Sequence, residues 1–500
     1  MVVYETRSGE KDSGWSRFPG RGLGDPLAYP GRRRDQAPLV NRGAVGETAV
    51  MPATAVALDQ IRHVTLSPEQ ERLAAEACAA IDADLMRRLV VGMVDIPSPT
   101  GEEGELAAWL ARTMTDLGLD ARYQPIDDLQ GNAIGRLAGQ GAGAHLLLYA
   151  PIDTLTAGDP AEDVPWAGPR LRADMRALAV EEGDFVTGLG ASNPKGHGAC
   201  LIAALAAIHR AGLRLSGDIT VGLGAGGMPT NRRPLERLRR YNAGQGNGCS
   251  FLLEQGVWPD YALIAKPGWA VAWEEVGLCW FRVTVHGTFS YVGSRHRMPY
   301  SNPIVTSGIF IRALEEWFAE YTARHTDGLV APQGNVGSIE GGWPRTASVS
   351  PAACEITIDL RLSPRTTPAQ ARAEFAAFIT RFRAANPEVS LDWDMVLSIE
   401  GTGTAQESWI VRAAIEAWEH ETGRPHAPIV ANSGATDANI LRSRGVPTAR
   451  IGMDRIGQDA PLALDFPSGM NVVDLREMRR LTRHLVRVAV NTCSRERGWR

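Results

Sequence analysis

The stretch Leu146–Thr154 has the sequence LLLYAPIDT, and the stretch Leu189–Cys200 has the sequence LGASNPKGHGAC. The first is a short apolar run, which predicts a buried strand that delivers Asp153 at its carboxyl end. In the second, a glycine turn precedes Asn193-Pro194. Asn is a favoured N-cap and Pro suits the first helical position, so we predict a helix that begins here with Lys195 in its first turn. Strand ends and helix starts of this kind are where open α/β sheets place their sites.

Both stretches resemble the motifs of the dizinc aminoacylase, acetylornithine deacetylase and succinyl-diaminopimelate desuccinylase family of amidohydrolases and exopeptidases. The family motifs are His-x-Asp on a strand and Gly-Arg-Gly-x-x-Asp-x-Lys-Gly. The turn IPSPTGEE between two helical patterns, at Ile96–Glu103, follows the order of the family's amino-terminal segment. Ser433–Ala438 (SGATDA) resembles the family's Gly-Thr-Asp-Ala turn, which contacts the substrate carboxylate. The resemblance extends over roughly Ala83–Val490.

The resemblance implies an α/β fold with a mixed-sheet α/β/α, aminopeptidase-like main domain. An inserted ferredoxin-like (α+β) lid and dimerisation domain is also implied, and a β-α-β-β-α-β pattern after Gly277 agrees with it. A homodimer formed through the lid domain follows from the same resemblance. The predicted divisions are a disordered or loosely packed extension at 1–57, the main domain at 58–276 and 397–500, and the lid domain at 277–396.

Composition restricts the kinds of partner. A chain of 500 residues with 44% hydrophobic content can bury a large core. A net charge of -5 gives no basic field, which argues against nucleic acid. Six cysteines without a Cys-x-x-Cys pair favour a reducing compartment. No run reaches membrane-spanning length and the start is polar, so we predict a cytoplasmic protein that does not use a membrane.

At the positions where the resembled family carries its zinc ligands, this sequence has residue types that do not usually bind zinc. The five positions hold Pro151, Asn193, Gly227, Lys266, and Phe466 or Pro467. A zinc pair needs imidazole nitrogens and carboxylate oxygens, and an ammonium group would repel the metal. The family's general base is also replaced, here by a glycine at 226. We therefore predict that the zinc pair is absent, with no cofactor and no metal ligand.

What remains in the cleft predicts a positively charged site. A helix start with two lysines attracts anions, and a lysine beside Asp153 could act as acid, base or nucleophile. The alternative is that Lys266 and Asp153 form a buried ion pair that only fills the vacated space. The predicted catalytic residues are Asp153, Lys195, Lys266 and His197.

The remaining candidates would bind the substrate. Tyr291 stands where the family carries a lid histidine that polarises the substrate carbonyl, and His296 could substitute for that histidine. The predicted substrate-binding residues are Asn193, Tyr291, His296, Ser433, Thr436 and Asp437.

Three functions fit these residues. The first is a hydrolase, without the zinc pair, that acts on the C–N bond of an amide or cyclic amide in a small carboxylate-bearing molecule. The second is a noncatalytic protein that binds a small anion or regulates another protein. The third is a metal-dependent amidohydrolase or peptidase with unusual ligands, such as His197, His296 and Asp153. The cleft keeps the turn Ser433–Asp437 and has two lysines, which favours the hydrolase without a zinc pair. We expect a small anionic molecule as its partner.

Overall fold

The main domain is built on a six-stranded sheet in the order β1-β2-β6-β3-β7-β16. The computed structural model describes residues 64–230, 244–454, 456 and 470–495, so the predicted extension at 1–57 lies outside the described residues. The strands β6, β3, β7 and β16 pair in parallel, whereas β1 with β2 and β2 with β6 are antiparallel. The predicted mixed sheet is therefore confirmed. The strands are β1 (Asp120–Pro125), β2 (Gly131–Leu137), β3 (Leu146–Pro151), β6 (Ile219–Gly224), β7 (Tyr261–Ala265) and β16 (Thr448–Ile451).

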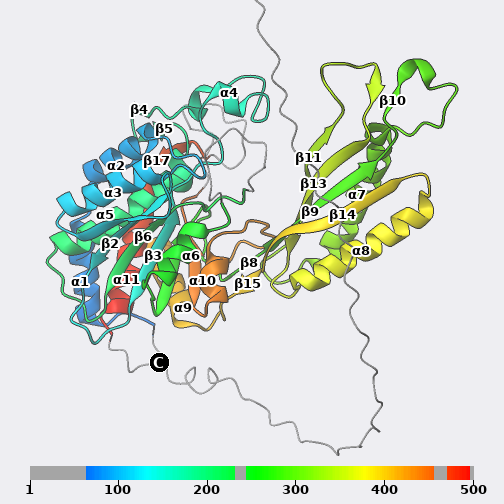
Figure 1. Ribbon diagram of the computed structural model, residues 1–500. Coiled ribbons are helices and arrows are strands. Elements are labelled where there is room, and N and C mark those ends of the chain that lie inside the picture. Colours follow the sequence, from blue (N-terminus) through cyan, green and yellow to red (C-terminus); the bar gives the residue numbers. More distant parts are fainter. Residues whose placement is uncertain (1–63, 231–243, 455, 457–469, 496–500) are drawn as a thin grey trace, which may run out of the picture. The chain divides into compact units, whose positions relative to one another are not determined.

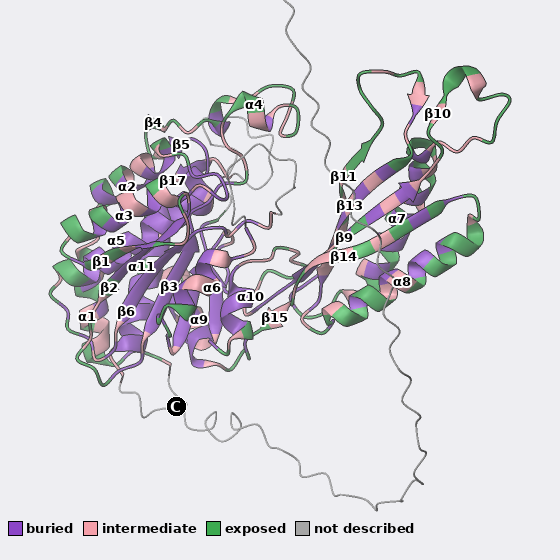
Figure 2. Ribbon diagram, in the orientation of Figure 1, coloured by how far each residue is buried: buried purple, intermediate pink, exposed green. Residues whose placement is uncertain are grey.

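Helices cover both faces of this sheet (Figure 1). Successive side chains of a strand point to opposite faces. In β3, Leu146 and Leu148 pack into one core, and Leu147 and Tyr149 into another. Every residue of β3 is buried, as are the central strands in Figure 2. The first core is covered by α1 (Pro68–Ala79), α2 (Ala83–Asp95), α3 (Gly104–Asp116), α5 (His197–Arg210), α9 (Trp409–Thr422) and α11 (Leu475–Cys493), and the second by α6 (Asn247–Glu254) and α10 (Ala438–Ser443).

The first two helices show how local signals set the helix boundaries. Ser67 and Gln70 form a capping box at the start of α1, and Pro68 occupies its first turn. The sequence pattern predicts one helical run from Pro68 to Val94. The structure divides it, because the Asp82 side chain accepts a hydrogen bond from the Leu85 amide at 2.8 Å and so caps a second helix.

A second domain contains a four-stranded antiparallel sheet in the order β11-β13-β9-β14. With its two helices it follows the β-α-β-β-α-β order, so the predicted ferredoxin-like fold is confirmed. Burial alternates along β13, and the buried side pairs with aromatic side chains of the helices, including Phe310 and Phe375. The elements are β9 (Gly277–His286), α7 (Pro303–His325), β11 (Gly334–Gly341), β13 (Ala353–Leu362), α8 (Pro368–Ala385) and β14 (Ser390–Ile399).

Several short strands form small sheets outside the two main sheets. Two of them, β8 and β15, join the chain segments that enter and leave the second domain. Among the described residues, no helix combines the length and the apolar character that crossing a membrane requires. The short elements are β4 (Val180–Glu182), β5 (Phe185–Thr187) and β17 (Val472–Asp474) in one sheet, β8 (Glu274–Glu275) with β15 (Thr402–Gly403), β10 (Ser290–Tyr291) with β12 (Val349–Ser350), and the helix α4 (Pro160–Asp163).

Candidate functional site

The candidate site lies at the carboxyl edge of the parallel strands. Asp153 follows β3, Gly226–Met228 follow β6, and Lys266 follows β7. The carboxyl ends of parallel strands meet at one edge of a sheet, which is where α/β proteins bind their ligands. Three separate parts of the chain therefore meet at this edge, two of them with a charged side chain.

Asp153 is buried and fully engaged by hydrogen-bond donors. Its Oδ1 accepts from the Gly227 amide at 2.9 Å, and its Oδ2 accepts from the Met228 amide and the Thr100 hydroxyl, both at 2.8 Å. Donors of this kind stabilise a buried carboxylate. Within the described residues no ion pair joins Asp153 to a lysine, so the predicted Lys266–Asp153 pair is not formed. Asp153 instead holds the turn after β6.

Lys266 forms a hydrogen bond with Asn193. Its Nζ donates to the Asn193 Oδ1 at 3.3 Å, and Lys266 is only 6% exposed. Burial lowers the pKa of Lys266, while the negative charges of Asp153, Asp437 and Glu275 act in the opposite direction. The lysine therefore lies close to these three carboxylates without a hydrogen bond to any of them.

Asn193 lines a pocket of about 590 Å³ on the outer side of this site. Half of its lining residues are apolar, and two of these, Trp166 and Leu155, are exposed. Asn193 contributes a polar group at the wall, which is typical of small-molecule sites. The other lining residues include Ala157, Met175, Leu189 and Met470, together with the charged Glu162, Asp163 and Arg172.

Lys195 lies elsewhere, which corrects the predicted two-lysine pocket. Its Nζ donates to the Ile96 carbonyl oxygen at 2.9 Å, at the end of α2. Burial lowers the pKa of Lys195 to about 7, and the charge of Asp95 acts in the opposite direction. The backbone at Asn193 is extended (φ -122°, ψ 112°), as is usual for an N-cap residue, and it is the only residue of the helical turn Ala191–Gly196 without helical backbone angles. Lys195 therefore lies in the helical turn that leads directly into α5, as the Asn193-Pro194 signal predicted.

His197 is fully used by the backbone around it. Its Nδ1 donates to the Ser192 carbonyl oxygen at 2.7 Å, and its Nε2 accepts from the Met453 amide at 3.1 Å. Accepting at Nε2 requires the neutral ring. Burial lowers the pKa of His197 to about 3. Both ring nitrogens are occupied, so this arrangement leaves none for the predicted catalytic role.

Asp437 fills the space that two glycines leave beside the turn after β6. A Cβ atom at Gly227 would lie 3.1 Å from the Asp437 Oδ2, and one at Gly246 would lie 2.8 Å from its Oδ1. The Tyr149 hydroxyl donates to the Asp437 Oδ2 at 2.8 Å. Burial raises the pKa of Asp437 to about 7, against the opposing charge of Lys266. The carboxyl group can therefore exchange a proton near neutral pH.

Glu103 is a buried site residue that the sequence did not reveal. Its Oε1 accepts from the Gly101 and Gly226 amides at 3.0 and 2.9 Å, and its Oε2 accepts from the Gln130 side chain at 3.0 Å. Burial raises the pKa of Glu103 to about 8, and the charge of Asp153 adds to this. A glutamate at the start of a helix is usually a capping residue, so only the tertiary structure shows this role.

The other predicted substrate-binding residues have protein partners or are exposed. The Ser433 hydroxyl donates to the Ala331 carbonyl oxygen, and the Thr436 hydroxyl donates to the Glu275 Oε2. Tyr291, in β10, is 61% exposed, and His296 is exposed in the loop after it. Within the described residues neither of these two forms a hydrogen bond or ion pair with the main domain. Their place in a site stays a prediction.

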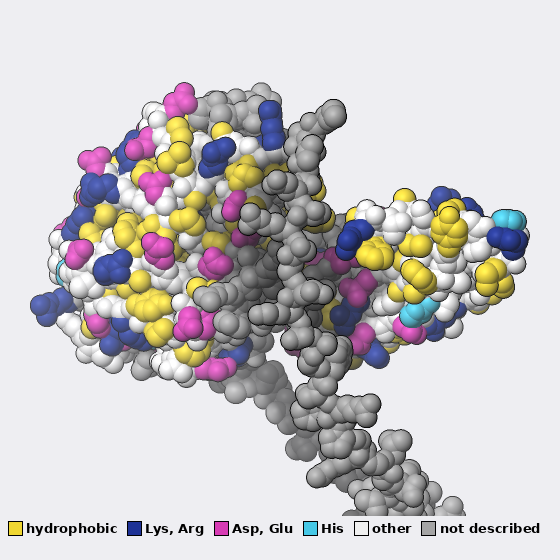
Figure 3. Space-filling view, turned by 45° about the horizontal axis from the view of Figure 1, so that its top comes forward, with side chains coloured by type: hydrophobic (Ala, Val, Ile, Leu, Met, Phe, Trp, Pro, Cys, Tyr) yellow, Lys and Arg dark blue, Asp and Glu magenta, His cyan; other side chains and the backbone are white. Residues whose placement is uncertain are grey.

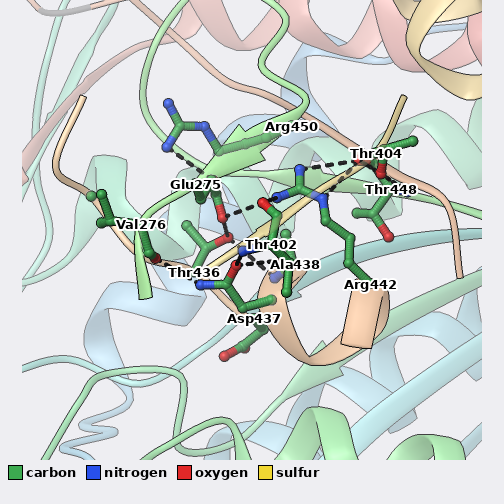
Figure 4. Close-up of polar contacts among 12 residues, drawn as sticks. Glu275, Val276, Thr402, Thr404, Thr436, Asp437, Ala438, Arg442, Thr448 and Arg450 are labelled. Carbon is green, nitrogen blue, oxygen red and sulfur yellow. Dashed lines mark hydrogen bonds and ion pairs between the residues drawn. The ribbon is translucent and has the colours of Figure 1, made fainter. Parts of the chain in front are cut away.

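A buried charge cluster at β8 was also missed by the sequence analysis (Figure 4). Glu275 lies 3.1 Å from the Arg450 Nη1 and 3.8 Å from the Arg442 Nη1. The Asn439 side chain donates to the Val276 carbonyl oxygen at 2.8 Å, which ties α10 to the same strand. The signal in the sequence was Arg450 itself, a charge inside an apolar parallel strand, where charges are rare unless paired.

The described residues do not supply the family's zinc ligands. Pro151, Gly227 and Lys266 have no donor atom for zinc, and Asn193 already accepts from Lys266. In the part of the chain that the structure describes, no three His, Cys, Asp or Glu side chains are grouped so that they could hold a metal ion. The fifth aligned position, 466 or 467, lies outside that part.

Comparison with known proteins gives the class of this architecture. Residues 274–385 match the family model of a peptidase dimerisation domain. The chain is 28% identical over 190 residues to a [LysW]-lysine hydrolase of Deinococcus radiodurans, which covers 38% of this chain and 42% of that protein. The match thus spans less than half the length of that relative.

Solved structures share the fold over most of the chain. Human carnosine dipeptidase 1 aligns with a TM-score of 0.63 at 15% identity, over 86% of this chain and 100% of that one. An M20 family metallo-carboxypeptidase from Sulfolobus solfataricus aligns with a TM-score of 0.58 at 14% identity, over 82% and 99%. The fold is that of two-domain peptidases and amidohydrolases. The chain is thus similar in fold to M20 metallopeptidases, and residues 274–385 match a peptidase dimerisation domain, in agreement with the resemblance of its motifs.

This relationship contradicts the prediction that the zinc pair is absent. The resembled family carries out its chemistry with zinc, and the Sulfolobus neighbour is a metallo-carboxypeptidase. The prediction of no cofactor is therefore wrong on this comparison. It depended on aligned ligand positions, and residues 231–243 and 457–469, which follow two of the family motifs, lie outside the described residues.

Replacing His197 with Phe should cost stability, because it leaves the Ser192 carbonyl and the Met453 amide buried without partners. We expect a loss of about 2–4 kcal/mol in urea unfolding at pH 7. The wild type should also lose stability as the pH falls below about 6.5, since only the unfolded chain then protonates this histidine. That acid slope should be smaller in the variant, and equal slopes would contradict the neutral, buried assignment.

Replacing Glu103 with Gln should change how stability depends on pH. The pKa of Glu103 is raised from 4.5 to about 8, so the unfolded chain loses this proton first and stability falls as the pH rises through that range. Between pH 5 and 8 the wild type should lose more than about 1 kcal/mol relative to Glu103→Gln in urea unfolding. Glu105→Gln, exposed on the same helix, is the matched control and should follow the wild type.

Proposed function

We propose that this protein is a hydrolase that cleaves the C–N bond of an amide or cyclic amide in a small molecule bearing a carboxylate. The observation that carries the proposal is the hydrogen bond from Lys266 to Asn193, since Asn193 lines the 590 Å³ pocket and Lys266 lies behind it. The family relationship supports the reaction class, because the related proteins include peptidases and a hydrolase. The whole chain's activity and substrate remain part of this proposal.

The pair has the chemistry to stabilise a negatively charged oxygen. Because the Asn193 Oδ1 accepts from Lys266, its Nδ2 is left to donate to a bound carbonyl group. The ammonium group behind it adds positive charge where an oxyanion forms. Asp437, with a pKa of about 7, is the nearby group that can take up and return a proton at neutral pH.

A second candidate is a protein that binds a small anion without turnover. It is favoured by the engagement of Asp153, Lys195 and His197, three of the four predicted catalytic residues, in hydrogen bonds that hold the fold. Binding without product formation, under every metal condition described below, would select this candidate over the hydrolase.

Turnover can be tested with the purified full chain on N-acetyl amino acids, dipeptides, N-carbamoyl amino acids and their cyclic counterparts. Each assay is run with added Zn²⁺ and with a chelator, so that the metal content of the preparation does not determine the result. Release of free amine that scales with enzyme is the expected result. Its absence for every substrate class and both metal conditions would overturn the hydrolase proposal.

The variant Lys266→Met should lower kcat/KM by at least about 100-fold, as the loss of an oxyanion-stabilising group does. Lys195→Met is the matched control, because it also removes a buried lysine but one that lies at the end of α2. We expect the control to lose stability in thermal unfolding while its folded fraction keeps its kcat/KM. Equal losses of kcat/KM in both variants would contradict the special role of Lys266.

We also propose a homodimer formed through the second domain. That domain matches a peptidase dimerisation domain and exposes large apolar side chains, which Figure 3 shows on its surface. Exposed groups of apolar residues commonly mark interfaces. They include Phe289, Tyr291, Val292, Met298, Ile304, Val305, Ile309, Ile339 and Trp343.

Light scattering after size-exclusion chromatography should give twice the chain mass for the wild type. The double variant Val305→Asp, Ile339→Asp should shift the protein to the monomer, because it buries two carboxylates at the interface. Leu178→Asp, which replaces an equally exposed residue of the main domain, should stay dimeric. A monomeric wild type would contradict the proposed dimer.

A further inference from the structure

Two buried guanidinium groups share one carboxylate beside the candidate site. The side chains of Glu275, Arg442 and Arg450 are 0%, 2% and 9% exposed. Arg442 is satisfied by other groups, since its Nε and Nη2 both donate to the Thr448 carbonyl oxygen at 3.1 Å. Glu275 is also occupied at Oε2 by the Thr436 hydroxyl. The cluster therefore carries more positive than negative charge.

Arg450 pairs through only one of its three guanidinium nitrogens within the described residues. Its Nη1 pairs with Glu275, while its buried Nε has no hydrogen-bond partner, and its Nη2 makes no hydrogen bond within the described residues. Figure 4 shows the side chain directing one nitrogen at Glu275 and the opposite edge away from the cluster. A buried donor without a partner is costly, so such groups are rare unless a ligand uses them.

The Nε and Nη2 atoms of an arginine together can bind one carboxylate through two hydrogen bonds, and in Arg450 these two atoms have no partner within the described residues. The same two atoms of Arg172 bind the Asp174 carboxylate at 2.9 and 2.8 Å in this protein. A carboxylate on such a fork receives two parallel charge-assisted hydrogen bonds. Arg450 thus has the same pair of donors in the geometry that suits a carboxylate.

Two glycines lie next to the guanidinium group of Arg450. A Cβ atom at Gly268 would lie 3.9 Å from its Nη2, and one at Gly434 would lie 3.9 Å from its Nη1. Gly434 is exposed and belongs to the turn Ser433–Ala438. Arg450 also acts electrostatically on Lys266, so it lies near the proposed reaction site.

We propose that Arg450, positioned by Glu275, binds the carboxylate of the substrate through its Nε and Nη2. This inference deepens the proposed function and rests on it for the identity of the ligand as substrate. It makes Arg450 the residue that selects acids over their neutral analogues. The bound carboxylate supplies the second negative charge that the two arginines lack.

The test compares N-acetylglycine with N-acetylglycinamide, which differ only in the carboxylate. Dissociation constants are measured by isothermal titration calorimetry on the full chain, with Zn²⁺ present. The wild type should bind the acid at least about 10-fold more tightly than the amide. Arg450→Lys, which keeps the charge but not the fork, should weaken binding of the acid by about 10- to 100-fold and leave binding of the amide unchanged.

Arg365→Lys is the matched control. Arg365 pairs with Glu274, the neighbour of Glu275, and its nitrogens are used by Glu274 and Asp327. This variant should keep the wild-type preference for the acid. Thermal unfolding shows that each variant is folded, and the two ligands on the wild type test the proposal without any variant.

The outcomes separate this proposal from the proposed function. Equal binding of acid and amide by the wild type, no binding of the acid at millimolar concentration, or an unchanged preference in Arg450→Lys would overturn the role of Arg450. Binding that depends on Arg450 without turnover of any amide would keep the carboxylate site and overturn the hydrolase. Turnover with the same KM for the acid in the wild type and in Arg450→Lys would keep the hydrolase proposal and overturn the carboxylate site.

Discussion

The candidate site depends on two buried carboxylates that hold a backbone turn. Glu103 accepts the amide of Gly226, and Asp153 accepts the amides of Gly227 and Met228. A buried carboxylate without such donors would cost several kcal/mol. This turn places Gly227 beside Asp437, and Gly224 at the end of β6 lies beside Tyr149, so a side chain at either position would clash. Glu103 and Asp153 therefore stabilise the backbone of the turn, and Asp437 is the acidic group beside it that remains for the proposed chemistry.

Much of the fold could be predicted because its signals are local. Continuous apolar runs such as Leu146–Pro151 identify central parallel strands, and capping residues identify helix starts. Alternation of Phe281, Val283 and Val285 identified a half-buried strand of the second domain. The order of the motifs then indicated the domain arrangement, because the second domain is inserted at a single point between two parts of the main domain.

The site could be predicted only in part, because its contacts depend on where each side chain points. Asn193 and Lys266 meet since both lie at the carboxyl edge of the sheet. Lys195 and His197 were predicted to lie with them, but both side chains point to backbone carbonyl groups, of Ile96 and Ser192 respectively. Glu103 had no distinguishing signal. Arg450 did have one, because a charge in a buried strand requires a partner.

Electrostatic balance connects the two halves of the site. Burial lowers the pKa of Lys266 and raises that of Asp437, so both groups lie closer to neutral pH than they would in water. The positive charge of Arg450 contributes to the lowered pKa of Lys266. A substrate carboxylate on Arg450 would add a negative charge near Lys266 and favour its ammonium form. Binding of an acid would therefore strengthen the positive charge that the proposed reaction needs, whereas a neutral analogue would leave it unchanged.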